Sequence, residues 1–372
     1  MAAINAFSLW GVRIRIDPSW FIAFLLFAWT LSTGYFPLQA PDYPASAYWI
    51  AGTLSALALF GSVLIHELGH CVAARRLGIP VRRITLFIFG GVSEMAQTHS
   101  TSPGAEFRTS VAGPLVSFAA AGLFGLMTLL VGGAASSIVV ETIRYLYFVN
   151  FLLAVFNLIP GFPLDGGRIL RSIVWRRTGD IRRATRLAAR AGVFMAVGMI
   201  GLGLVNLFAM HFVAGVWLLL IGLFLKRSAE MERKAFELQF TLKDFALRQI
   251  MSPSIAVEAS TPVSDFVNNY VFRYHDRAFP VVANGRFIGM TDIRSIKRIP
   301  ASEWSSARIG ECLSDASTYC VLDPDVDAGE AMQLLSAGKR THAPVVREGI
   351  LLGMLTRDDL FKLVSLKNDL AA

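Results

Sequence analysis

Charged residues are scarce in this sequence. Of its 372 residues, only 17% are Asp, Glu, Lys or Arg, whereas 54% are hydrophobic. An ordinary soluble domain carries about 25% charged residues. The scarcity excludes a wholly soluble chain, because the apolar excess lies in the first ~230 residues, in runs long enough to cross a bilayer. We expect a polytopic membrane domain over residues 1–230, followed by a soluble region.

Cysteine is also rare. The three cysteines, Cys71, Cys312 and Cys320, show no framework spacing, which excludes a disulfide-stapled fold and favours a cytosol-facing soluble region with reduced thiols. A removable signal peptide is not expected either. The first apolar run, residues 19–36, is longer than a signal-peptide core and lacks a clear small-x-small cleavage site.

The net charge of +8 is unevenly distributed. Residues 1–240 contain 20 Lys and Arg against 11 Asp and Glu, whereas residues 241–372 contain 15 against 16. Eight arginines lie between Arg168 and Arg190. Basic clusters beside apolar spans mark the cytoplasmic side of a membrane. Their position between two spans disfavours a nucleic-acid patch, so we expect no nucleic-acid partner.

Six apolar stretches predict membrane-spanning helices. They cover residues 19–36, 48–74, 110–132, 138–159, 188–208 and 210–226. The basic residues that flank them all fall on one side of the bilayer if the chain crosses six times. We therefore expect a multi-pass protein of a prokaryotic cell membrane, with both termini and the soluble region in the cytoplasm.

The segment from Val81 to Met95 does not fit these spans. β-branched and aromatic residues nearly alternate in it, and the pair Gly90-Gly91 follows. The pattern predicts a β-hairpin. A surface loop at the cytoplasmic interface is the alternative, because strand backbone at membrane depth is tolerated only beside protein or a water-lined cavity.

The second span contains the sequence His66-Glu67-Leu68-Gly69-His70. On a helix, the two histidines four residues apart share one face and can reach one metal ion, while Glu67 is placed to accept a proton from water. Ionisable residues inside a membrane cost on the order of 2.5 kcal/mol or more each, which disfavours a chance occurrence. Arg75 follows His70 by five residues, so the motif lies ~8 Å from the cytoplasmic boundary.

Two histidines leave a zinc site at least one protein ligand short. Asp165 is the best candidate for this ligand, in the Pro- and Gly-rich sequence Asn157-Leu-Ile-Pro-Gly-Phe-Pro-Leu-Asp-Gly-Gly167 that follows the fourth span. On its own, Asp165 is better explained as a helix cap, because Asp favours caps and turns.

The motif of His66 to His70, together with the sequence from Asn157 to Arg168, resembles the site-2 protease family of intramembrane metalloproteases. The resemblance covers Pro18 to about Arg171. It implies that His66, His70 and Asp165 bind one Zn²⁺ ion and that Glu67 is the general base.

The same resemblance also suggests where substrate binds. Asn157 corresponds to a residue that helps to hold the substrate backbone or the oxyanion. Gly90 and Gly91 match the family's glycine-bearing hairpin, which implies that unwound substrate is presented as an added strand.

The soluble region contains an internal repeat. The sequence from Ala278 to Val282 recurs from His342 to Val346, and Gly289 recurs 64 positions later as Gly353. Each copy predicts a βαββα-like unit, and together they predict an intramolecular pseudo-dimer with α/β structure.

Each copy resembles the cystathionine-β-synthase (CBS) domain, which we place at residues 242–300 and 305–369. The resemblance implies an adenine nucleotide (ATP, ADP or AMP) bound through Thr356 and Asp359 of the second copy. The first copy has Asp292 and Ser295 at the matching positions, which puts its site in doubt. A purely structural pair, or one that mediates a homodimer, is the alternative.

The leading hypothesis is thus an intramembrane zinc endopeptidase that cuts a membrane-anchored protein within or near its transmembrane segment, modulated by the CBS pair. A transporter or channel gated by CBS domains is compatible with the spans but leaves His66, Glu67 and His70 unexplained. A catalytically silent relative would be expected to lack Glu67.

Overall fold

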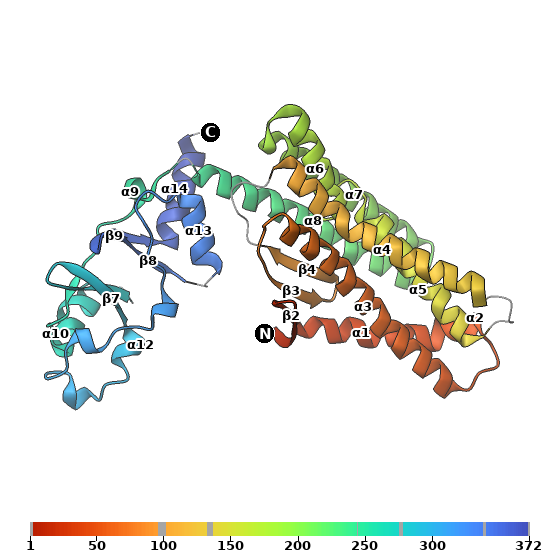
Figure 1. Ribbon diagram of the computed structural model, residues 1–372, viewed down its shortest axis with the longest axis horizontal. Helices are drawn as coiled ribbons and strands as arrows, with labels where there is room; N and C mark the ends of the chain where they lie inside the picture. The colour runs from red at the N-terminus through yellow and green to blue at the C-terminus, as the bar shows by residue number, and fades with distance from the viewer. Residues whose placement is uncertain are drawn as a thin grey trace. The chain divides into compact units, whose positions relative to one another are not determined.

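The computed structural model describes residues 3–95, 102–131, 137–243, 245–274, 278–337 and 340–370. The chain separates into two compact units, the N-terminal unit (Met1–Arg233) and the C-terminal unit (Lys234–Ala372). Figure 1 labels their helices and strands.

Six helical segments among the described residues are long and apolar enough to span a membrane, which confirms the predicted number. They are α1 (Pro18–Thr30) continued to α2 (Phe36–Gln39), α3 (Ala45–Arg76), α4 (Pro103–Val131), α5 (Ile138–Asn157), α7 (Ile181–Phe208) and α8 (Phe212–Leu242). Several of these helices extend beyond their predicted bounds, because the apolar stretches in the sequence mark only the apolar part of each helix and leave out its charged ends. The helix α4, for example, begins before residue 110 and includes Glu106 and Arg108. A shorter helix, α6 (Asp165–Thr178), follows α5.

The predicted hairpin is present and consists of β3 (Val81–Phe87) and β4 (Gly90–Met95), paired antiparallel. Figure 1 shows these strands beside α3. The surface-loop alternative is therefore wrong.

The hairpin belongs to a larger sheet that the sequence did not predict. Two further strands, β1 (Ile4–Leu9) and β2 (Val12–Ile16), pair antiparallel, and β2 pairs in parallel with β3, which gives the order β1-β2-β3-β4. Trp10 and Gly11 join β1 to β2 with φ angles of 50° and 76°, as a two-residue hairpin turn of type I′ requires. The alternation in Val12–Ile16 is a usable signal for a strand, although Arg13 and Arg15 also fit basic residues that flank the first span.

The sheet is fixed to the C-terminal half of α3 by a shared core. Ile14 and Ile84 of the sheet and Val63, Cys71 and Ala74 of α3 are all buried in it. The sheet thereby holds β4 alongside the turn of α3 that carries the histidine motif, as the packing of α3 against β4 shows.

The C-terminal unit shows the predicted repeat down to its strand register. In β6 (Ala278–Ala283) and β7 (Arg286–Asp292), Pro280 pairs with Met290; in β8 (His342–Arg347) and β9 (Ile350–Thr356), Pro344 pairs with Met354. Both hairpins contain an irregularity between their two consecutive valines. The helices α12 (Ile293–Ile296) and α14 (Arg357–Leu370) follow the two hairpins.

The two halves of this unit have separate cores. One contains Val257, Phe266, Phe279 and Ile309 among its buried residues. The other contains Leu242 and Leu247, from the start of the unit, together with residues of the second repeat. The backbone of Ser252 also pairs with that of Met354, with N–O distances of 2.9 Å. Leu242, Leu247 and Ser252 therefore pack with the second repeat, although they lie within the segment expected to form the first CBS domain.

Replacing Ile84 by alanine tests the role of the sheet core. Ile84 is fully buried, so Ile84→Ala should lower the free energy of unfolding by about 2–5 kcal/mol. Ile4→Ala is the matched control, because Ile4 lies in the same sheet and is 55% exposed; it should change the free energy by less than about 0.5 kcal/mol. Thermal unfolding in detergent measures both, and equal effects would contradict a core at Ile84.

Candidate metal centre

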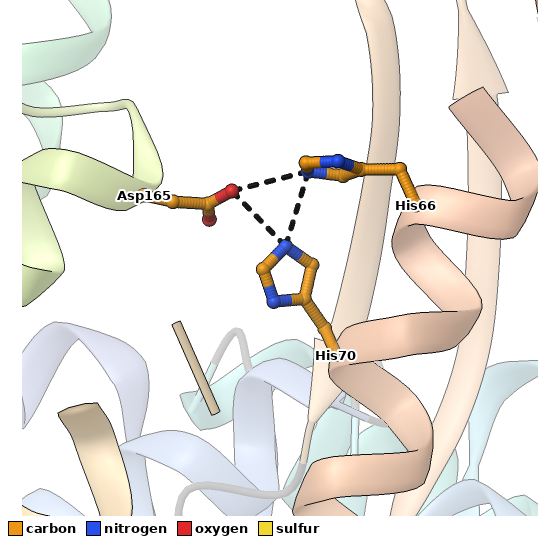
Figure 2. Close-up of side chains that lie close together, drawn as sticks. All are labelled: His66, His70 and Asp165. Atoms are coloured by element: carbon orange, nitrogen blue, oxygen red, sulfur yellow. Dashed lines mark hydrogen bonds and ion pairs between the residues drawn. The ribbon is translucent and has the colours of Figure 1, made fainter. Parts of the chain in front are cut away.

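Three predicted ligands meet at one point in the N-terminal unit. The helix α3 places His66 and His70 on one face, and Asp165 reaches them from the first residue of α6 (Figure 2). Oδ2 of Asp165 lies 3.1 Å from Nε2 of each histidine, and the two Nε2 atoms are 3.2 Å apart. Both imidazoles are buried. Among the described residues, this is the group of His, Cys, Asp and Glu side chains that could hold a metal ion.

The other ring nitrogens show that the three atoms are acceptors. Nδ1 of His70 donates to the carbonyl oxygen of Thr109 at 2.8 Å, which leaves a lone pair on Nε2 of the neutral ring. Nδ1 of His66 lies 2.9 Å from Oγ of Ser117, and the same tautomer results if it donates there. With both rings neutral in this tautomer, two nitrogen lone pairs and a carboxylate oxygen converge, which is an arrangement that can bind a metal ion.

This geometry fits zinc. Tetrahedral bonds of about 2.0–2.1 Å place ligand atoms about 3.3 Å apart, close to the observed separations of 3.1–3.2 Å. The hydrogen bonds at Nδ1 fix the ring orientations, as outer-shell partners of metal-binding histidines do. A zinc ion needs a fourth ligand, which leaves one position for water or substrate.

One face of α4 supports both histidines, and the sequence interpretation missed it. Thr109, Gly113 and Ser117 are spaced four residues apart, so they lie on that face. A Cβ atom on Gly113 would lie 2.2 Å from Nε2 of His70 and 2.7 Å from Nε2 of His66. Position 113 therefore has to be glycine. The i, i+4, i+8 spacing of small residues in an apolar span was the available signal.

Asp165 does not cap its own helix. The N-cap of α6 is Leu164, and no side chain there makes a capping hydrogen bond, so the capping interpretation of Asp165 is wrong.

Close backbone packing fixes the loop before Asp165. A Cβ atom on Gly167 would lie 2.5 Å from the carbonyl carbon of Gly161, and one on Gly192 of α7 would lie 2.1 Å from the carbonyl oxygen of Phe162. The amide of Phe162 donates to the carbonyl of Ala188, also in α7. These approaches explain Gly167 of α6 and Gly192 of α7 as packing requirements of the loop.

Glu67 points towards β4 and is not one of the three clustered ligands. Its Oε2 accepts a hydrogen bond from the hydroxyl of Ser93. A Cβ atom on Gly91 would lie 2.6 Å from Cγ of Glu67, so Gly91 makes room for this side chain. Gly90 begins β4 with a φ angle of 134° and has open space around its Cα atom. The sequence interpretation had not identified Ser93.

A cavity of about 600 Å³ adjoins the metal ligands. Its walls include Glu67, the residues from Phe87 to Ser93, and Asn157, the last residue of α5. The amide nitrogen of the Asn157 side chain donates to the carbonyl of Leu153 at 3.0 Å, which leaves its amide oxygen available. Apolar side chains in the wall include Trp217 and Phe224 of α8, and Arg168 adds a charged one.

The nucleotide-binding candidates, Thr356 and Asp359, form a capping box at the start of α14. Oδ2 of Asp359 accepts from the backbone and the hydroxyl of Thr356, and the amide of Asp359 donates back to that hydroxyl. In the first repeat, Asp292 and Ser295 have the two residue types exchanged, and Asp292 accepts from the backbone and hydroxyl of Ser295. Both repeats thus keep the helix cap, but the carboxylate sits three residues earlier in the first.

The fold and the site define a polytopic membrane metallopeptidase with a zinc-type ligand set. Comparison with protein families agrees, since the model of peptidase family M50 matches residues 54–134 and 121–199 and that of the CBS domain matches residues 316–366. The chain belongs to peptidase family M50, the site-2 protease family, and is a zinc metallopeptidase.

Relatives extend over nearly the whole chain. Rip3 of Mycobacterium tuberculosis, named as a zinc metalloprotease, is 34% identical over 95% of this chain and 91% of its own. The protein sll0528 of Synechocystis sp., named likewise, is 32% identical over 96% of this chain and 94% of its own. A solved site-2 protease structure from Methanocaldococcus jannaschii is 30% identical and covers 62% of this chain and 95% of that chain, with a TM-score of 0.42.

Loss of a ligand should abolish stoichiometric zinc binding. We expect purified protein to contain about one zinc ion per chain and His70→Ala or Asp165→Asn to contain a small fraction of that, because a tetrahedral site loses one of its three protein ligands. Elemental analysis of protein purified in detergent measures the zinc content. Asp180→Asn is the control, since Asp180 is an exposed carboxylate that caps α7. Unchanged zinc in Asp165→Asn would remove Asp165 from the ligand set.

Proposed function

We propose that this protein is an intramembrane endopeptidase that cleaves a membrane-anchored protein within or near its transmembrane segment. His66, His70 and Asp165 hold the zinc ion, and Glu67 is the general base. The observation that carries the proposal is the convergence of two imidazole lone pairs and a carboxylate oxygen, 3.1–3.2 Å apart, beside a cavity in a bundle of membrane-spanning helices.

Glu67 and residues of the cavity wall carry the catalytic roles that the metal ion does not. Zinc, when bound, acts as a Lewis acid and lowers the pKa of water to about 7 in known hydrolases. Glu67 takes the proton from the attacking water and returns it to the leaving nitrogen. The hydroxyl of Ser93 keeps the carboxylate of Glu67 turned towards the cavity. Asn157 also lines the cavity, where its side chain can support the substrate carbonyl or the oxyanion.

The free edge of β4 is the proposed substrate platform. Among the described strands, β4 is the last in the order β1-β2-β3-β4, and its residues Gly90 to Ser93 line the cavity. An unpaired edge offers backbone donors and acceptors to an extended peptide. A helical substrate keeps its carbonyls in its own hydrogen bonds, so it must unwind locally before it can pair with Gly90 and Gly91.

We place the site near the cytoplasmic face of a prokaryotic cell membrane. Arg75 and Arg76 end α3 close to His70, and the arginine-rich segment of α6 and α7 follows Asp165. The positive-inside rule then puts both termini and the C-terminal unit in the cytoplasm. Division of the chain into a protease domain over residues 1–230 and CBS domains over 242–300 and 305–369 forms part of the same proposal.

We propose that the C-terminal unit regulates the protease by binding ATP, ADP or AMP at the second repeat. Thr356 and Asp359 are the contacts, and Asp292 and Ser295 provide no equivalent carboxylate in the first repeat. Binding shifts the protease only if the nucleotide prefers one of two arrangements of the chain. Association of two CBS pairs into a homodimer is compatible with this role.

Glu67→Gln should abolish cleavage while zinc stays bound. Co-expression with a panel of tagged single-span membrane proteins should give a shortened fragment with the wild type, and at least ~100-fold less with the variant, because the general base is lost. Glu303→Gln, a substitution on an exposed 3₁₀ turn, is the control. Fragments that persist with Glu67→Gln would contradict the assignment of this site as the protease active site.

Nucleotide binding should raise the thermal stability of the protein. Saturating ATP, ADP or AMP stabilises the native state by RT ln(1 + [L]/Kd), and Asp359→Ala should reduce that ligand-induced shift. Because Asp359→Ala also removes a helix cap, Asp292→Ala is the matched control: it loses the equivalent cap but should keep the full shift. No shift with any of the three nucleotides would favour a purely structural CBS pair.

A further inference from the structure

The three metal ligands come from two helices, and these helices must stay a fixed distance apart to keep the ligands together. His66 and His70 lie on α3, whereas Asp165 begins α6 after a loop. The helix α4 packs against both α3 and α6. Its contacts with the histidines, through Thr109 and Ser117, are described above. What holds α6 against α4 is a separate feature.

A buried ion pair joins α4 to α6. Nε of Arg171 lies 2.6 Å from Oε1 of Glu106, and Nη2 of Arg171 also contacts that oxygen. The Glu106 side chain is 9% exposed and the Arg171 side chain 16% exposed. Such a pair is well shielded from solvent, and removal of one partner leaves an uncompensated buried charge. The contact therefore resists separation of the two helices.

The ion pair connects the parts of the structure that orient the ligands. Glu106 precedes Thr109, whose carbonyl accepts from His70, by three residues, so the two lie on the same turn of α4. Arg171 follows Asp165 by six residues on α6, or ~9 Å along the axis. The guanidinium of Arg171 also lies 5.1 Å from the ring centroid of Phe162, in the loop that precedes Asp165.

We infer that Glu106 and Arg171 are positioning residues that hold Asp165 at ligand distance from the two histidines. This inference rests on the proposed zinc ligands. The pair fixes α6 and its preceding loop against the same turn of α4 that orients His70. Neither residue belongs to the cavity wall or to the ligand set, so both act on the metal through Asp165.

Zinc affinity of the full-length protein, titrated in detergent against a competing chelator, tests the inference without a substrate. Arg171→Met and Glu106→Gln should each weaken zinc binding by about 10–100-fold, as loss of outer-shell partners does. Arg171→Lys keeps the positive charge but not the planar set of guanidinium donors, so it should weaken zinc binding less. Arg144→Met is the matched control, because it also removes the arginine partner of a buried acid, Glu141. Glu141 lies ~24 Å along α5 from Asn157, which lines the cavity. Arg144→Met should leave the affinity unchanged.

A double-mutant cycle shows whether the effect passes through Asp165. Asp165→Asn retains two histidine ligands, and its weaker affinity is measured with excess zinc. Arg171→Met should add little further loss in that background, because coupled residues are non-additive. Equal losses in both backgrounds, or wild-type affinity in folded Arg171→Met, would overturn the inference. If Arg171→Met fails to fold, wild-type affinity in Arg171→Lys and Glu106→Gln would overturn it. Wild-type protein that binds no zinc would instead refute the proposed metal centre itself.

Discussion

Three atoms that can ligate a metal ion meet inside an apolar helix bundle, and a bound cation would hold them together. The bond from His70 to the carbonyl of Thr109 is central, because a carbonyl cannot donate and a neutral ring then presents a lone pair at Nε2. Burying such groups without a partner is costly. The arrangement of α3, α4 and α6 and the hydrogen bonds at Nδ1 are consistent with one requirement, which is to keep these atoms 3.1–3.2 Å apart.

Glycine creates much of the site by allowing close approach. Gly113 lets α4 lie against the two imidazoles, and Gly91 lets β4 lie against Glu67. Gly167 and Gly192 let the loop before Asp165 pack between α6 and α7. At each of these positions a Cβ atom would lie less than 3 Å from a neighbour. Gly91 thus has a structural role beside the one that the family resemblance implies, because it makes room for the side chain of Glu67.

The C-terminal unit shows how a repeat can keep its fold while its chemistry changes. Thr356 and Asp359 cap one helix, and Asp292 and Ser295 cap its counterpart with the residue types exchanged. Because either arrangement satisfies the backbone donors at a helix start, the exchange preserves local structure. It moves the carboxylate by one helical turn, however, so the two repeats present different side chains at the matching positions.

The sequence by itself determined the six apolar helices, the hairpin, the repeat and the spacing of His66 and His70, because these depend on local periodicity and composition. It could not decide whether Asp165 capped a helix or faced the histidines, and the family resemblance had to suggest the answer. Only the tertiary structure placed Thr109, Ser93 and the Glu106–Arg171 pair at the site. Their contacts join segments between 26 and 65 residues apart, and no local pattern specifies which distant side chain fills a given space.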